Sequence, residues 1–311
     1  MINFNITKLW MSSLIGLSLF FGSALGNPAD ELRVVATIPD LANLAEEIGG
    51  ELVTVRSLSR GSENLHSIPV RPSMLIALSK ADLFLQMGLS MEAAWLPDLM
   101  IRAKNEQVRP GATGFQNCSA GWQAIQVPKQ LSRRQGDIHR EGNPHFNLDP
   151  MGGAHLAKAV HQALVRVDPK HEENYDAGLE RWMKRLESKR KQWDAIAKKV
   201  KGGKIAVYHT EYAYLAARLG LEVVVSIEPK PGIPPGPTDV ARVVGAMKEH
   251  EVNVILTASW SNNRQVADIA RRTGATIVEL PNQVKGADWA TGWIELMDGV
   301  HERLAKAFQI E

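Results

Sequence analysis

The chain is poor in cysteine, and its charges nearly balance. Cys118 is the only cysteine among 311 residues, which excludes an internal disulfide framework and a metal site built from several thiolates. Lysine and arginine together number 36, aspartate and glutamate 34, so the formal net charge is +2. This balance lacks the basic surplus typical of proteins that bind nucleic acid or anionic membranes. Composition therefore gives no reason to expect either partner.

The N-terminus has no acidic residue before the first long apolar run. Lys8 is the only charged residue in positions 1–26, and residues 9–25 are mainly apolar or small. Small residues at 24–26 and a polar sequence after them are typical of a secretory signal peptide over 1–26. The apolar run is shorter than the about 20 residues that span a membrane, and no cysteine at the cut site offers lipid attachment. We expect a periplasmic protein, with no lipid anchor and no stable membrane insertion after cleavage.

Strand-like and helix-like segments alternate along the mature chain. Short apolar runs predict strands over 33–37, 52–58, 82–87, 204–208, 221–226, 252–257 and 276–280. Several of the intervening segments have helical spacing of apolar residues. This alternation favours parallel sheets covered by helices. Residues 103–144 show little periodicity.

One segment, 169–201, predicts a single long helix. Its apolar residues recur at steps of three, four or seven and form one stripe: Tyr175, Leu179, Trp182, Leu186, Trp193, Ile196 and Val200. Gly202 and Gly203 end it. We therefore expect an α/β protein with two lobes, each a mostly parallel sheet flanked by helices, joined by one long rigid helix. The expected N-terminal lobe is 27–168 and the C-terminal lobe 202–311.

Three histidines follow strands or lie in loops between elements: His66, His145 and His209. In α/β sheets, ligands bind outside the carboxyl ends of the strands, and neutral imidazole is a common zinc ligand. Taken alone, a histidine in a loop is more often an ordinary polar residue than a metal ligand. The other histidines outside loops fall in helical stretches, where we expect solvent exposure: His155, His161, His171, His250 and His301.

Four motifs in order give the chain a family resemblance. They are Val34–Leu41, His66 with Pro72-Ser73 after it, Asn143–Pro150, and Tyr208-His209 with Tyr212 after it. Over nearly all of its mature length the sequence resembles the metal-binding components of bacterial ABC importers for zinc and manganese. These are the cluster A-I, or ZnuA/TroA-like, solute-binding proteins.

The resemblance implies one metal site with ligands from both lobes: His66, His145, His209 and a carboxylate, for which we choose Asp288. Glu211 and Glu228 are the alternatives for the carboxylate. Many zinc-binding members carry a long loop rich in histidine and acids, which this sequence lacks. His139, in the segment before His145, is expected to be an auxiliary ligand at best.

Three imidazoles and one carboxylate suit tetrahedral Zn²⁺, whereas Mn²⁺ prefers more oxygen ligands. The resemblance implies a monomeric protein that captures a divalent metal between two lobes and delivers it to an ABC permease. A filled coordination shell leaves no position for a catalytic water, so we do not expect an enzyme. Because imidazole must be neutral to coordinate, affinity is expected to fall below about pH 6.

Other functions remain open at this point. A periplasmic chaperone that delivers metal to another protein would need the same site. A secreted zinc hydrolase would need an open coordination position and a general base, for which Glu211 is the candidate, although no HExxH motif occurs. A binding protein for an organic solute is the third alternative, with Trp260 and Trp289 lining its pocket.

Overall fold

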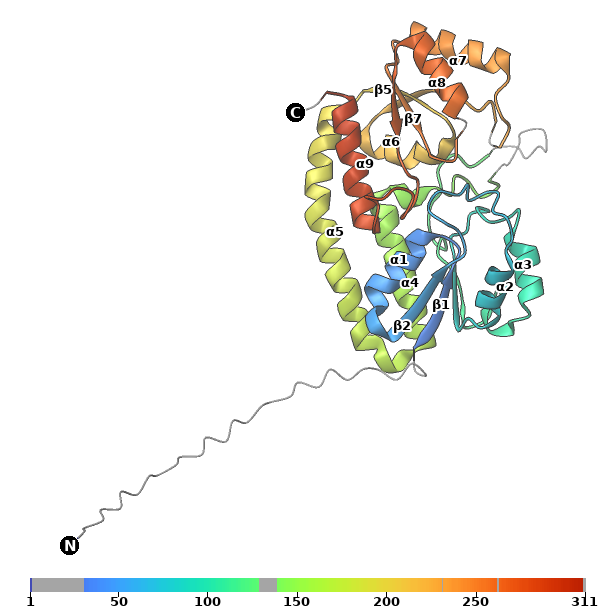
Figure 1. The fold of residues 1–311 in the computed structure, drawn as a ribbon, viewed down its shortest axis with the longest axis vertical. Helices are drawn as coiled ribbons and strands as arrows, with labels where there is room; N and C mark the ends of the chain where they lie inside the picture. The colour runs from blue at the N-terminus through green and yellow to red at the C-terminus, as the bar shows by residue number, and fades with distance from the viewer. Residues whose placement is uncertain (2–30, 129–138, 231, 262, 310–311) are drawn as a thin grey trace.

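The computed structural model of the chain describes residues 1, 31–128, 139–230, 232–261 and 263–309. The expected signal peptide falls on residues outside this set and stays a prediction. Among the described residues, no helix combines the length and the apolar character needed to cross a membrane. The described part forms two α/β units stacked along one long helix (Figure 1).

The first unit is built on a parallel four-stranded sheet in the order β2-β1-β3-β4. Its strands are β1 (Leu32–Ala36), β2 (Val53–Ser57), β3 (Leu83–Gln86) and β4 (Phe115–Asn117). Its helices are α1 (Pro39–Gly49), α2 (Pro72–Ser79), α3 (Leu96–Ala103) and α4 (Pro150–Val167). The central strands are buried apolar runs, as expected where helices cover both faces of a parallel sheet.

The second unit repeats this plan with the strand order β6-β5-β7-β8, again all parallel. Its strands are β5 (Lys204–Val207), β6 (Glu222–Ser226), β7 (Val254–Thr257) and β8 (Thr276–Glu279). Its helices are α6 (Ala213–Leu219), α7 (Pro237–Glu249), α8 (Asn263–Thr273) and α9 (Trp293–Ala307). In both sheets the first strand in sequence is central, so its carboxyl end lies at the middle of the sheet edge.

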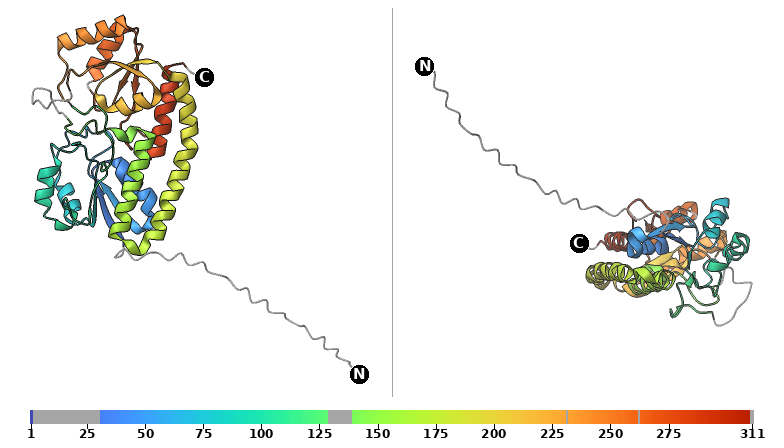
Figure 2. Two further views of the ribbon diagram at one scale, coloured as in Figure 1. Left: turned by 180° about the vertical axis from the view of Figure 1, so that it is seen from behind. Right: turned by 90° about the horizontal axis from the view of Figure 1, so that it is seen from below.

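Helix α5 (Glu172–Val200) runs along both units (Figures 1 and 2). Its buried face contains Tyr175, Trp182, Leu186, Trp193 and Val200, which all belong to the predicted stripe. The helix contacts α1 and α4 at one end and α6 and α9 at the other. The predicted fold class, two lobes joined by a long helix, is confirmed. The exact lobe limits of 27–168 and 202–311 remain an interpretation.

The last helix, α9, packs against both units, an arrangement that the sequence does not indicate. Helix α9 packs along α5 and also contacts α1 of the first unit. Trp293 is fully buried, its ring centroid 5.5 Å from that of Trp182, and its indole donates to the Asn147 carbonyl at 2.9 Å. One core cluster accordingly extends from the first sheet through α5 into α6 and α9.

Two local expectations need correction. No strand was expected in residues 103–144, but β4 lies there. Its three residues are too few to produce a recognisable pattern. His301 was expected to be exposed, but it is fully buried in α9. It stacks on Trp193 with centroids 5.1 Å apart, and its Nδ1 donates to the Met297 carbonyl at 2.7 Å.

Candidate metal centre

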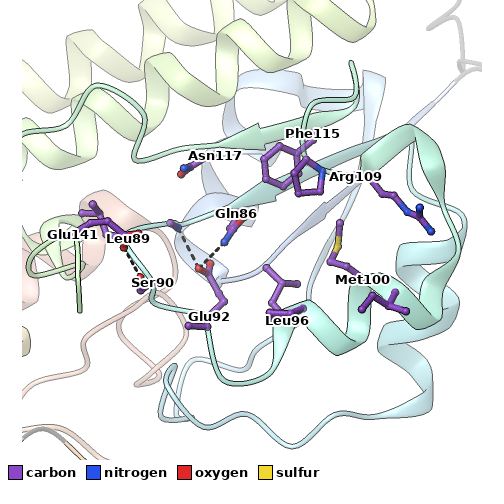
Figure 3. Close-up of a pocket in the computed structure, with 15 residues that line it drawn as sticks. Gln86, Leu89, Ser90, Glu92, Leu96, Met100, Arg109, Phe115, Asn117 and Glu141 are labelled. Carbon is purple, nitrogen blue, oxygen red and sulfur yellow. Dashed lines mark hydrogen bonds between the residues drawn. The ribbon is translucent and has the colours of Figure 1, made fainter. Parts of the chain in front are cut away.

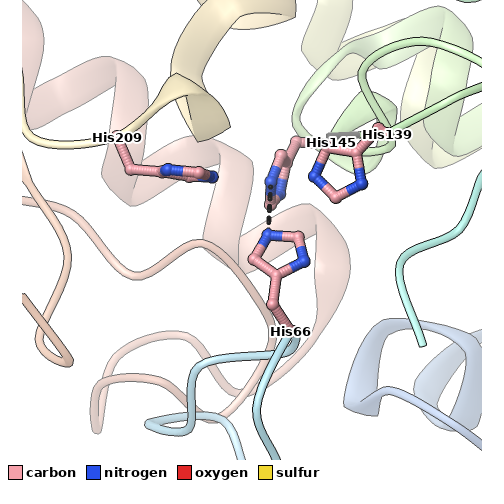
Figure 4. A group of neighbouring side chains, drawn as sticks. All are labelled: His66, His139, His145 and His209. Atoms are coloured by element: carbon pink, nitrogen blue, oxygen red, sulfur yellow. Dashed lines mark hydrogen bonds between the residues drawn. The ribbon is translucent and has the colours of Figure 1, made fainter. Parts of the chain in front are cut away.

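Four histidine rings meet between the two units. His66, His139, His145 and His209 each offer one ring nitrogen, and these four atoms all lie within 4.8 Å of one another. Figure 4 shows the rings facing a common point, with His209 opposite His139 and His145. Nε2 of His66 and Nε2 of His145 are 3.2 Å apart. In a tetrahedral zinc shell with bonds of 2.0–2.1 Å, two ligand nitrogens lie about 3.3 Å apart, so the group has the dimensions of a metal site.

His66 lies in the turn between β2 and α2, beyond the carboxyl end of the first sheet. Its backbone N–H donates to Oδ1 of Asn64 at 3.0 Å. The carbonyl of the preceding residue, Leu65, accepts from the Trp95 indole at 3.0 Å. The residue His66 as a whole is half-buried, while its ring lies deep enough for loss of solvation to dominate its pKa.

His139 and His145 come from one segment that leads into α4. The His145 N–H donates to Oδ1 of Asn143 at 2.9 Å, and the Gly142 N–H donates to the His139 carbonyl at 3.1 Å. Gly142 has φ +103°, and a Cβ there would lie 2.7 Å from the Ala124 Cβ. Glycine is therefore required at the turn that brings both rings to the same side.

His209 follows β5 and is the only member of the group from the second unit. Its Nδ1 donates to Oε2 of Glu228 at 2.8 Å, and both side chains are buried. Glu228 lies just after the neighbouring strand β6 and also accepts from the Gly232 N–H at 3.3 Å. A carboxylate on one ring nitrogen fixes the tautomer and leaves Nε2 for a metal.

Burial keeps three of the four rings neutral, those of His66, His139 and His145. Loss of solvation, followed by the nearness of the other rings, holds the pKa of His66 and of His145 well below the ordinary value of 6.5. The same burial lowers the pKa of His139 to about 4. Neutral imidazole is the form that coordinates metal, so the group is ready to bind near neutral pH.

The structure brings together the three predicted histidines but places His139, not Asp288, beside them. Asp288 is exposed, in a turn closed by the Lys285 N–H donating to the Ala290 carbonyl at 2.7 Å. Within the described residues the group contains no carboxylate. His139 was expected to be auxiliary because it lies where many family members carry a long loop rich in histidine and acids, which this sequence lacks. The signal that favours His139 is its position six residues before His145 in a glycine-containing loop.

The two other acids considered have different surroundings. Glu228 contacts His209 and does not join the four rings. Glu211 is fully buried, and neither carboxylate oxygen has a hydrogen-bond partner among the described residues. Burial raises the pKa of Glu211 to about 7, against the opposing influence of His209. Neither acid is placed as a direct member of the group.

Direct hydrogen bonds link the two units around the histidines. The Asn143 side chain donates to the Thr210 carbonyl at 2.9 Å, and the Tyr214 hydroxyl donates to the Asn143 carbonyl at 2.8 Å. On the opposite side, the Gln283 amide donates to the Glu63 carbonyl at 3.0 Å. Contacts on both sides of the group thus join the two units around it.

The family model for the zinc-uptake complex component A, periplasmic (ZnuA), matches residues 34–307. The chain belongs to this family. Among the curated relatives of this chain, the high-affinity zinc uptake system protein ZnuA of Bacillus subtilis is 25% identical over 89% of this chain and 87% of the relative. The iron-binding protein YfeA of Yersinia pestis is 22% identical over 86% of this chain and 83% of the relative. A manganese ABC transporter substrate-binding lipoprotein, PsaA of Streptococcus pneumoniae, is 24% identical over 58% of this chain and 57% of the relative.

Solved structures share the fold of this ZnuA-family chain. A crystal structure of ZnuA superposes with a TM-score of 0.76 at 23% identity, covering 89% of this chain and 99% of the other. A periplasmic metal binding protein from Candidatus Liberibacter asiaticus superposes with a TM-score of 0.74 at 18% identity, covering 89% and 99%. At these identities the likeness establishes the two-lobed fold alone.

Proposed function

We propose that this chain is an extracytoplasmic solute-binding protein that captures a divalent transition metal between its lobes and delivers it to an ABC permease. The observation that carries the proposal is the group of four histidines, with ligand nitrogens within 4.8 Å of one another and drawn from both lobes. Family membership supports it, since relatives are named as zinc uptake, iron-binding and manganese transport proteins. Those relatives are binding proteins, which favours a function other than catalysis.

The proposed cargo is zinc. Relatives name zinc, manganese and iron, so the family does not decide among them. Four imidazoles without an oxygen ligand suit tetrahedral Zn²⁺, whereas Mn²⁺ favours carboxylate, carbonyl and water ligands. The proposed ligands are His66, His139, His145 and His209. Asp288, the carboxylate expected from the sequence, stays as the alternative fourth ligand.

Capture follows from the division of ligands between the lobes. Three of the rings belong to the first unit and His209 to the second, so a bound ion bridges them. An ion that binds only the closed arrangement stabilises that arrangement by mass action. A permease that contacts both lobes would then distinguish loaded from empty protein. Four protein ligands fill a tetrahedral shell and leave no position for the water of a zinc hydrolase.

Metal analysis and titration test the proposal. Mature protein, residues 27–311, is purified, freed of metal, and titrated with Zn²⁺ and Mn²⁺ in competition with a chromophoric chelator. We expect one zinc per chain, tighter than manganese, and weaker binding after alanine replaces any of the four histidines. His161→Ala is the matched control, because His161 is outside the group and contacts Asp176 instead. Absence of any titratable site in the wild type would overturn the proposal.

Export and delivery need separate tests. The mass of the protein recovered from the periplasm should show that cleavage follows Gly26, and size-exclusion chromatography should show a monomer. Zinc-dependent growth of a strain lacking the chain should be restored by the wild type and not by His145→Ala. Normal growth of the deletion strain in zinc-depleted medium, with loss of activity of one zinc enzyme, would support delivery to a protein instead of a permease.

A further inference from the structure

A strained turn lies directly beside His66. Gly88, Leu89 and Ser90 all have positive φ, at 90°, 50° and 60°. Two of these residues are not glycine, and a residue with a side chain adopts this conformation only at an energetic cost. We call residues 88–92 the Gly88 turn. Surrounding contacts must hold it in place.

Glu92 provides those contacts from inside the protein. Its carboxylate is buried, with 1% of the residue exposed. Oε1 accepts from the Thr37 hydroxyl at 2.6 Å and from the Met87 N–H at 2.8 Å, and Oε2 accepts from the Gly88 N–H at 3.2 Å. The Gln86 side chain adds a longer bond at 3.4 Å (Figure 3). One buried side chain thereby fixes the start of the turn to β1 and β3.

The other side of the turn contacts the metal centre. The Met91 carbonyl lies close enough to the His66 ring to raise its pKa, against the larger lowering effect of burial. Because Nε2 of His66 faces His145, Nδ1 is the nitrogen left for this carbonyl. The Ser90 hydroxyl donates to Glu141, two residues after His139. The Gly88 turn therefore touches the loops that carry two of the four proposed ligands.

Beside the turn is a cavity into which it has room to move. The cavity has a volume of about 700 Å³ and is lined by the turn itself and by apolar side chains that include Leu96, Met100 and Phe115. Figure 3 shows Glu92 and Ser90 at one end and these apolar side chains at the other. Because no side chain of the described residues packs against the turn on the side of the cavity, the hydrogen bonds to Glu92 contribute more to holding it in place.

We propose that Glu92 is a positioning residue of the metal site: it holds the Gly88 turn so that the Met91 carbonyl orients the His66 ring. The inference rests on the proposed function and deepens it. Glu92 does not join the four rings; its effect reaches the ion through Met91 and His66. Hydrogen bonds of this kind to a metal-binding histidine fix its tautomer and ring orientation, and their loss lowers metal affinity by about 10- to 100-fold.

The test compares Glu92→Gln with a matched control, Asp168→Asn. Asp168 is also a buried carboxylate with several donors, the His171 ring and the Tyr175 hydroxyl, but it lies at the α4–α5 corner. Each variant is measured for Zn²⁺ affinity and for the Tm of the metal-free protein. The state of the His66 ring nitrogens is measured by ¹⁵N NMR with and without zinc. Thr37→Val, which removes a single donor to Glu92, is the milder variant if Glu92→Gln does not fold.

Both variants are expected to lower the Tm of the metal-free protein. Only Glu92→Gln and Thr37→Val should also lower zinc affinity, by about 10- to 100-fold for the former, and alter the His66 nitrogen signals. Glu92→Gln with zinc affinity within about twofold of wild type and an unchanged His66 tautomer would overturn the inference. If wild-type protein binds no zinc, the proposed function fails. The His66 signals of metal-free protein would then still decide the role of Glu92.

Discussion

The two lobes have the same sheet plan but supply the metal centre differently. The first contributes three rings from loops; the loop of His66 is held by the Trp95 indole, which donates to the Leu65 carbonyl. The second contributes one ring, His209, held by the buried carboxylate of Glu228. The first lobe alone can offer three nitrogens to an ion, whereas the second can only complete the shell. If the group binds metal as proposed, the first lobe captures the ion and the second retains it.

The largest effect should come from removing a ring of the first lobe. His145→Ala leaves two rings on that lobe, whereas His209→Ala leaves all three. If four ligands share the about 10–16 kcal/mol of a tight zinc site, one is worth about 3 kcal/mol, or on the order of 100-fold in affinity. We expect at least this loss for His145→Ala and a smaller one for His209→Ala, measured by chelator competition. Equal losses would contradict the division of roles between the lobes.

A second effect concerns the junction between the lobes. Asp40, at the start of α1, is fully buried. It accepts from the Asn147 side chain at 2.9 Å and from the Val284 N–H at 3.0 Å, and Asn147 also donates to the Asn282 carbonyl. Burial raises the pKa of Asp40 from 3.8 to about 6, although both hydrogen bonds oppose the rise. The folded protein therefore binds this proton more tightly than the unfolded chain.

The sign of the pH dependence follows from that difference. The stabilising contribution of Asp40 is fully present below about pH 3.8 and is lost as the pH rises through about 6. Asp40→Asn removes this titration. We expect the wild type to lose up to about 3 kcal/mol relative to the variant between pH 4 and pH 7, measured by urea unfolding of metal-free protein. Parallel curves for the two proteins would show that Asp40 does not titrate in this range.

The third prediction tests whether Glu228 acts by orienting the His209 ring without itself coordinating the ion. Glu228→Gln keeps the shape of the side chain but removes the charge that fixes the His209 tautomer. Zinc affinity should fall by about 10- to 100-fold, because the ring is then no longer held in the tautomer and orientation that present Nε2 to the ion. Glu222→Gln, an exposed position on β6, is the control. Unchanged affinity for Glu228→Gln would mean that the rest of the site is sufficient to orient the ring.

Much of the fold was predictable from the sequence, because its causes are local. The strand and helix periods identify the alternating elements, and the single stripe on α5 identifies the helix that joins the lobes. The position of α9 was not predictable, since packing of Trp293 against Trp182 joins residues far apart in the chain. His301 was misjudged for the same reason, because stacking on Trp193 covers it.

The candidate site was predictable only in part. The structure brings His66, His145 and His209 together; their positions after strands or in loops made them candidates, and the family motifs around them identified them. The fourth member depended on tertiary contacts. The turn at Gly142 directs His139 toward His145. Gly61 packs against the backbone of Lys285 and holds the segment after Lys285 against the His66 loop. The Asp288 side chain is left exposed on that segment, because of a contact between residues far apart in the chain, which the sequence does not indicate.

The smallest expected effect therefore belongs to Asp288. Asp288→Asn should change zinc affinity by no more than about twofold, because an exposed carboxylate outside the group adds only weak, screened attraction for the ion. His139→Ala, measured in the same titration, should weaken binding on the order of 100-fold if His139 is the fourth ligand. The opposite pattern, with loss at Asp288 and none at His139, would show that the bound protein adopts a different arrangement. In that arrangement the 283–290 segment would carry its carboxylate to the ion, and the second lobe would supply two ligands instead of one.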